Sequence, residues 1–107
     1  MDDVRLVRVL KALADPQRFR MVQELGQGGE LSCGEVCRRF ALSQPTVSHH
    51  LKLLFDAGVL TVRHEGQHHF FSVDRDVVAE VGALLPSRLR AERRGRARGS
   101  GRPGTRV

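Results

Sequence analysis

Residues 43 to 54, SQPTVSHHLKLL, combine an apolar stripe with a face of hydrogen-bonding groups. Val47, Leu51 and Leu54 fall at i, i+4 and i+7, the spacing that places apolar side chains along one side of a helix. The opposite face carries short or planar polar groups and one cation, with no carboxylate. These residues are Pro45, Thr46, Ser48, His49 and Lys52. Such a face can meet the donors and acceptors of DNA bases and the charge of phosphates.

Cys33 and Cys37 stand four residues apart and are the only cysteines of the chain. On one helix, two thiols at this spacing can bind a soft metal ion or meet a common oxidant. They also share a stripe with Val36 and Phe40, the face that a helix turns toward the core, and buried thiols are inert. A packing role is therefore predicted, and sensing by the two thiols is the alternative.

Three histidines follow in the segment 64 to 69. His68 and His69 are neighbours on a predicted strand and point to opposite faces, whereas His64 and His68 could face each other across a hairpin. Two ligands without a third or fourth make a poor zinc site. An exposed polar wing is the expected role, with no metal and no cofactor. The sequence also lacks a phosphate loop, a nucleophile motif and a recognisable carboxylate pair, so an enzyme is not expected.

The net charge of +6 comes from the end of the chain. Six arginines and no acid follow Glu92, so residues 1 to 92 hold 12 basic and 12 acidic side chains. We expect a folded domain over 1–92 and a disordered Arg/Gly-rich tail over 93–107, either solvated or a mobile arm on nucleic acid. No apolar run approaches the roughly 20 residues needed to cross a bilayer, and the start MDD is unlike a signal peptide. A cytoplasmic protein with reduced thiols is predicted.

The elements that must position these residues can be read from capping residues and periodicity. Asp15 with Pro16, Ser32 with Glu35, and Ser43 are helix-start signals, and Gly58 marks a helix end. Four helices are expected first: one over 3–15, one from 16 to the glycines at 26–29, one beginning at 33, and one over 44–57. A hairpin over 59–73 with its loop at 65–67 follows. A last helix begins after Asp74, and Pro86 bends or ends it.

This order predicts a mainly α fold with a β-hairpin wing. Two short helices joined by the turn 41–43 form a helix-turn-helix, and a hairpin directly after the second helix makes it winged. The helix 44–57 would lie in the major groove of DNA with its first turns toward base edges. Between Arg38 and His64 there are four cations against the single acid Asp56, as expected for a surface that faces phosphates.

The run LADPQRFRMVQEL, followed by LSQPTVSHHLKLLFDAGVLTVRHEGQHHFFSV, resembles the ArsR/SmtB family of bacterial winged-helix repressors over about residues 5–85. The resemblance implies a homodimer joined through its first and last helices. The dimer would bind an inverted-repeat operator and repress transcription until a signal releases it. By position, the resemblance implies DNA contacts at Gln44, Pro45, Thr46, Ser48, His49 and His50, with Arg63 and His68 near the wing.

The chain departs from the family pattern at four places, the first being His64, which replaces the arginine usual before Glu65. Gln67 stands where members often have arginine, and a neutral amide can still hydrogen-bond a phosphate or a minor-groove edge. Ser32 and Gly34 occupy the two principal cysteine positions of the third-helix metal box, and the segment DRDVVAEVGALLPSRLR has no histidine for the zinc-type site of the last helix. We therefore expect neither of the family's two metal sites in this chain, and the sequence does not identify an inducer.

Two residue sets complete the prediction. The DNA-binding set is Ser43, Gln44, Pro45, Thr46, Ser48, His49, His50, Lys52, Arg63, Gln67 and His68. The dimer interface is formed by apolar residues that a chain of this size does not readily cover alone, Leu6, Val9, Leu10, Val78, Val81 and Leu85. A winged-helix module for protein interaction is the other function class considered. Such a module would be expected to expose apolar or acidic side chains on the reading face of helix 44–57, and there we expect this only of Leu53.

Overall fold

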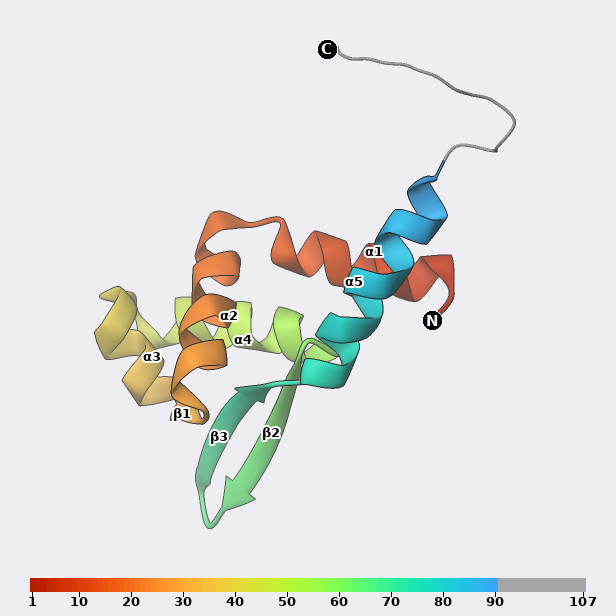
Figure 1. Cartoon of the computed structure of the whole chain (residues 1–107). Helices are drawn as coiled ribbons and strands as arrows, with labels where there is room; N and C mark the ends of the chain where they lie inside the picture. The colour runs from red at the N-terminus through yellow and green to blue at the C-terminus, as the bar shows by residue number, and fades with distance from the viewer. Residues whose placement is uncertain (91–107) are drawn as a thin grey trace.

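The computed structural model describes residues 1–90, and the end of the chain from 91 to 107, including the predicted tail 93–107, lies outside the described residues. The elements follow the predicted order, with one added strand (Figure 1). They are α1 (Asp3–Leu13), α2 (Pro16–Gly28), β1 (Leu31–Ser32), α3 (Cys33–Phe40), α4 (Gln44–Asp56), β2 (Leu60–Glu65), β3 (His68–Val73) and α5 (Arg75–Leu89). The mainly α fold with a hairpin wing is confirmed.

The predicted capping residues start the helices that build the helix-turn-helix. At α3 the Ser32 hydroxyl accepts from the Glu35 N–H at 3.2 Å, and the Glu35 carboxylate accepts from the Ser32 N–H at 2.8 Å. This backbone hydrogen bond from Ser32 lowers the pKa of Glu35 below its usual value. The turn itself passes through Ala41, whose left-handed φ of 53° ends α3, and Ser43 then caps α4. Local chemistry therefore sets the relation of α3 to α4.

The core lies where the first four helices meet the sheet and α5. Its members are apolar side chains with almost no exposed surface, and every element except β3 contributes at least one. The core comprises Leu6, Val9, Ala12, Met21, Leu25, Leu31, Val36, Val47, Leu51, Leu54, Ala57, Val59, Leu60 and Val81. Because Val47, Leu51 and Leu54 are the predicted stripe of α4, the opposite side of that helix is turned outward.

The wing is a three-stranded antiparallel sheet in the order β1-β3-β2, not the predicted two-stranded ribbon. Strand β1 pairs with β3 through Leu31 and Ser32, two residues that are too few to show a period in the sequence. The hairpin loop is also one residue shorter than predicted, because Glu65 pairs with His68 and only 66–67 lie in the turn. This shift changes the partner of every residue in the hairpin.

Helix α5 crosses near the start of α1, at the end of the molecule away from the wing (Figure 1). The amino group of Met1 bonds the Glu80 carboxylate at 2.9 Å, and Arg88 pairs with Asp3. The helix continues to Leu89, so the prediction that Pro86 could end it is wrong. Within residues 1–90, no helix has both the length and the apolar character needed to cross a membrane.

Candidate nucleic-acid interface

The outer side of α4 exposes most of the side chains that the sequence predicted. Gln44, Pro45, Thr46, Ser48, His49 and Lys52 are all exposed. The Ser43 hydroxyl accepts from the Thr46 N–H and donates to the Thr46 hydroxyl at 2.9 Å, so both hydroxyls take part in the helix cap. Gln44 and His49 make no such cap contact and lie on the first two turns. These two side chains are therefore the strongest candidates for contacts with base edges.

An open groove of about 770 Å³ runs between α4 and the hairpin. Its apolar floor is formed by Leu51, Phe55, Val62 and Phe71, which come from α4 and both long strands. One bank carries Gln44, Ser48, Lys52 and Asp56 of α4, and the other carries His64, Gln67, His68 and His69 of the hairpin. The groove thus brings five members of the predicted DNA-binding set together, Gln44, Ser48, Lys52, Gln67 and His68.

Lys52 and Asp56 form an ion pair on the α4 bank. The Lys52 Nζ lies 3.0 Å from the Asp56 carboxylate, and both side chains are at least half exposed. Exposed pairs at i, i+4 on a helix contribute only about 0.3–0.5 kcal/mol. The ion pair with Asp56 therefore holds Lys52 only weakly.

His50 faces the interior side of α4, although the prediction placed it on DNA. Its Nδ1 lies 3.3 Å from the Arg18 Nη1, and the Nε of Arg18 donates to the Ala12 carbonyl at 2.7 Å. The guanidinium can only donate, so Nδ1 acts as the acceptor here. The half-buried His50 thus links α4 to α2.

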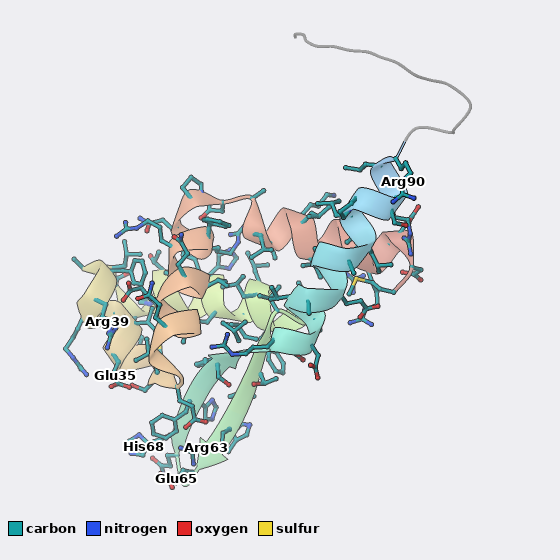
Figure 2. All side chains as sticks on the ribbon, viewed as in Figure 1. Glu35, Arg39, Arg63, Glu65, His68 and Arg90 are labelled. Carbon is teal, nitrogen blue, oxygen red and sulfur yellow. The ribbon has the colours of Figure 1, made fainter. Side chains whose placement is uncertain are left out.

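Arg63 lies on the outer face of the hairpin, outside the groove. Its Nε donates to both carboxylate oxygens of Glu30 at 3.1 and 2.9 Å, and Glu65 approaches its Nη1 at 3.5 Å (Figure 2). The guanidinium also stacks over the Phe70 ring, 4.7 Å from its centroid. The hydrogen bond from Arg63 lowers the pKa of Glu30, and the bond to Glu30 raises the pKa of Arg63. The predicted DNA contact by Arg63 is therefore not supported by its position.

The shorter hairpin loop creates a histidine pair that the sequence analysis missed. His64 is opposite His69, not His68, and their ring centroids lie 4.4 Å apart in an edge-on arrangement. Both rings line the groove. A two-residue loop at Gly66 and Gln67 in the sequence would have indicated this register, because it moves each cross-strand partner by one position.

Cys33 and Cys37 are half-buried and pack against the core. Burial, followed by the neighbouring Cys33, raises the pKa of the Cys37 thiol above its usual value. The Cys33 Sγ lies 3.6 Å from the Ser48 Oγ. In residues 1–90 no three His, Cys, Asp or Glu side chains come together as a metal site.

The predicted dimer residues divide into two groups. Leu6, Val9 and Val81 are only 4%, 0% and 8% exposed in the single chain, so the structure corrects their assignment: they belong to the protomer's own core. Leu10 and Leu85 are half-buried, and Val78 is 42% exposed. A stripe that packs in the core and a stripe that contacts a partner would have the same helical spacing, so the sequence alone does not separate them.

Comparison with known proteins places this arrangement among bacterial regulators. A helix-turn-helix domain family matches residues 13–63. The transcriptional repressor SdpR of Bacillus subtilis (strain 168) is 35% identical over 72 residues, which cover 67% of this chain and 79% of SdpR. The arsenical resistance operon repressor of Staphylococcus xylosus is 37% identical over 85 residues, covering 75% and 76% of the two chains.

Solved structures share the fold. Reduced HlyU from Vibrio cholerae N16961 superposes with a TM-score of 0.63 at 32% identity, covering 81% of this chain and 92% of HlyU. An ArsR-like transcriptional regulator from Rhodococcus sp. RHA1 superposes with a TM-score of 0.72 at 21% identity, covering 78% of each chain. At that identity, the Rhodococcus structure supports the fold alone.

Proposed function

Because the chain belongs to the ArsR/SmtB family of winged helix-turn-helix transcriptional repressors, we propose that it acts as a homodimer on an inverted-repeat operator. As a member of this family it is a DNA-binding regulator and not an enzyme. Its site of action in this proposal is the cytoplasm, where the DNA of its bacterial relatives lies.

The observation that carries the proposal is the outward face of α4. Gln44 and His49 are exposed on its first two turns, and its apolar stripe is fixed in the core. In this proposal α4 enters the major groove, where Gln44 and His49 contact base edges and Lys52 contacts a phosphate. The sugar-phosphate backbone that separates the major groove of DNA from its minor groove then lies in the protein's own groove, between α4 and the hairpin.

The dimer contact is assigned to α1 and α5. On α1, Val4 and Val7 are 68% and 48% exposed and line a shallow hollow together with Arg8 and Lys11. On α5, Val78 is 42% exposed. Exposed valines on two adjacent helices form an apolar surface suited to a two-fold contact. Such a dimer would set two α4 helices about 34 Å apart, in successive major grooves.

Cys33 and Cys37 serve in packing in this proposal. A raised pKa leaves Cys37 with little thiolate at neutral pH, and the thiolate is the form that binds soft metals or reacts with oxidants. The identity of an inducer is therefore not assigned to these thiols.

The test begins with an operator selected from random duplexes by the full chain. Gln44→Ala and His49→Ala should each reduce discrimination between the operator and single-base variants by about 1–3 kcal/mol, because each removes a base contact. Binding to random duplex should change little. Gln23→Ala, at an exposed glutamine on α2, is the matched control and should keep full discrimination.

The same titration tests the dimer. The full inverted repeat should bind far more tightly than a duplex with one half-site, because two linked contacts raise the affinity. Full discrimination in both variants would show that α4 does not read the bases. Equal affinity for one and two half-sites would contradict the dimer.

A further inference from the structure

All five histidines of the chain lie on α4 or on the hairpin. His49 and His50 are on α4, and His64, His68 and His69 are on β2 and β3. Three of the five line the groove between α4 and the hairpin. Histidine is the side chain whose ordinary pKa places its charge change near neutral pH. The groove therefore collects most of the histidine side chains of residues 1–90.

Formal positive charge is scarce in this groove. Among the described residues that line it, Lys52 is the only lysine or arginine, and it is paired with Asp56 at 3.0 Å. On the hairpin bank the polar side chains are His64, Gln67, His68 and His69, with no permanent cation. A DNA strand in the groove would place its phosphates opposite these imidazoles. The charge needed on that bank has to come from histidine.

Arg63 does not supply this charge. Side chains alternate along a strand, so Arg63 and Phe70 point to the face opposite His64 and His69. The guanidinium is held there by both oxygens of Glu30 and by the Phe70 ring. The Nε–H shared between the two carboxylate oxygens and the stacked ring together hold its direction. Moving Arg63 to the groove would break all of these contacts.

We infer that His64 and His69 are the phosphate-binding groups of the wing and that they bind DNA in the protonated form. The inference rests on the proposed DNA binding and adds the contacts that hold the backbone. Both rings are exposed on the groove and lie side by side, 4.4 Å between centroids, so one phosphate can accept a hydrogen bond from each.

The pairing also makes binding depend on protons. Two imidazolium rings this close repel each other, and a phosphate that accepts a hydrogen bond from both rings offsets that repulsion. The other titratable or charged groups on the groove are Cys33, Lys52, Asp56 and His68. Arg63 and Glu65 lie on the opposite face of the hairpin, and His68, which pairs with Glu65, belongs to that face by register although it also lines the groove. DNA binding therefore takes up protons, and affinity decreases as the pH rises through the range in which histidine loses its proton.

The experiment is a fluorescence-anisotropy titration of the full chain with random-sequence duplex at pH 6, 7 and 8. Ionic strength is constant, EDTA is present to exclude metal bridges, and the dye is insensitive to pH. Wild type should bind at least about tenfold more weakly at pH 8 than at pH 6, because each linked proton can contribute up to tenfold per pH unit. The slope of log affinity against log salt should be steeper at pH 6 by up to about two units.

Two double variants identify the groups. His64→Gln/His69→Gln should bind like wild type at pH 8 and lose most of the gain at pH 6. His64→Arg/His69→Arg carries permanent charge and should bind tightly at every pH. Both changes are at exposed positions, and circular dichroism melting checks that the variants fold.

The outcomes are distinct. If wild type binds duplex with no change in affinity between pH 6 and 8, the inference is overturned and the proposed function stands. If the Gln variant keeps the pH dependence of wild type, other groups carry it and the inference is also overturned. If wild type binds no duplex at any pH, the proposed function itself fails.

Discussion

The two faces of the β2–β3 hairpin differ in whether their cationic groups already have a partner. On the outer face, Arg63 is bonded to Glu30 and stacked on Phe70. On the groove face, His64 and His69 contact each other and open onto the groove. A permanent charge with an internal partner is less available to DNA than a titratable group without one. On the proposal made above, the availability of a side chain, more than its formal charge, would select the phosphate contacts of this wing.

The largest expected effect is on the stability of the protein, to which a side chain on the groove face should contribute more than one on the outer face. Phe71 packs against the core, whereas its neighbour Phe70 lies under Arg63 on the outer face. Phe71→Ala should lower the free energy of unfolding by about 2 kcal/mol or more, since a buried phenylalanine contributes more than this and Phe71 is half-buried. Phe70→Ala should cost about 1 kcal/mol, mainly through the lost cation–π contact.

Urea denaturation followed by circular dichroism measures both values. The two variants are matched controls for each other, because they remove the same side chain from adjacent residues of one strand. Equal losses would mean that the outer face contributes to the core as much as the groove face does.

Much of the fold could be predicted from the sequence because its signals are local. Ser32 with Glu35 and Ser43 with Thr46 act within one helical turn, and the stripe of α4 repeats often enough to be recognised. Local signals of this kind also placed Gln44, His49 and Lys52 on the outward side of α4. These assignments depend on helical spacing alone.

What could not be predicted depends on residues far apart or on a single register. Glu30 and Arg63 are 33 positions apart, and nothing near either residue indicates their pairing. The His64–His69 pair required the loop length to be correct to one residue. For Val9 and Val81, helical spacing identified an apolar face but not whether it covers the core or a partner. The elements were therefore predicted better than the contacts between them.

The second expected effect compares Lys52 with Arg63. Lys52→Ala should weaken binding to all duplexes alike and lower the salt slope by about one unit, because one phosphate contact is lost. Arg63→Ala should leave the salt slope unchanged, since its charge is already matched by Glu30 and it lies outside the groove. Titrations of random duplex at several salt concentrations measure both slopes. A decrease of one unit in Arg63→Ala would place Arg63 on DNA and remove the contrast between the two faces.

The smallest expected effect is on the pH dependence of stability and concerns Glu30. The hydrogen bond from Arg63 lowers the pKa of Glu30, so the ionised carboxylate is favoured in the folded state. For a lowered pKa, the stabilisation is fully present above the ordinary pKa of glutamate and is lost as the pH falls through the lowered value. Glu30→Gln should therefore melt slightly below wild type at neutral pH and converge with it in acid.

The matched control for Glu30→Gln is Glu65→Gln, which removes the longer contact to the same guanidinium, 3.5 Å against 2.9 Å. Glu65 should give the smaller decrease in melting temperature at neutral pH, because Glu30 holds Arg63 with both oxygens. Both carboxylate side chains are exposed, so solvent screens each ion pair. Both substitutions should therefore destabilise the protein less than Phe70→Ala does. A difference between Glu30→Gln and wild type that persists unchanged in acid would mean that the carboxylate charge is not what holds Arg63. The outer face would then be organised by the stacking of Arg63 on Phe70, and the contrast with the groove face would rest on ring contacts alone.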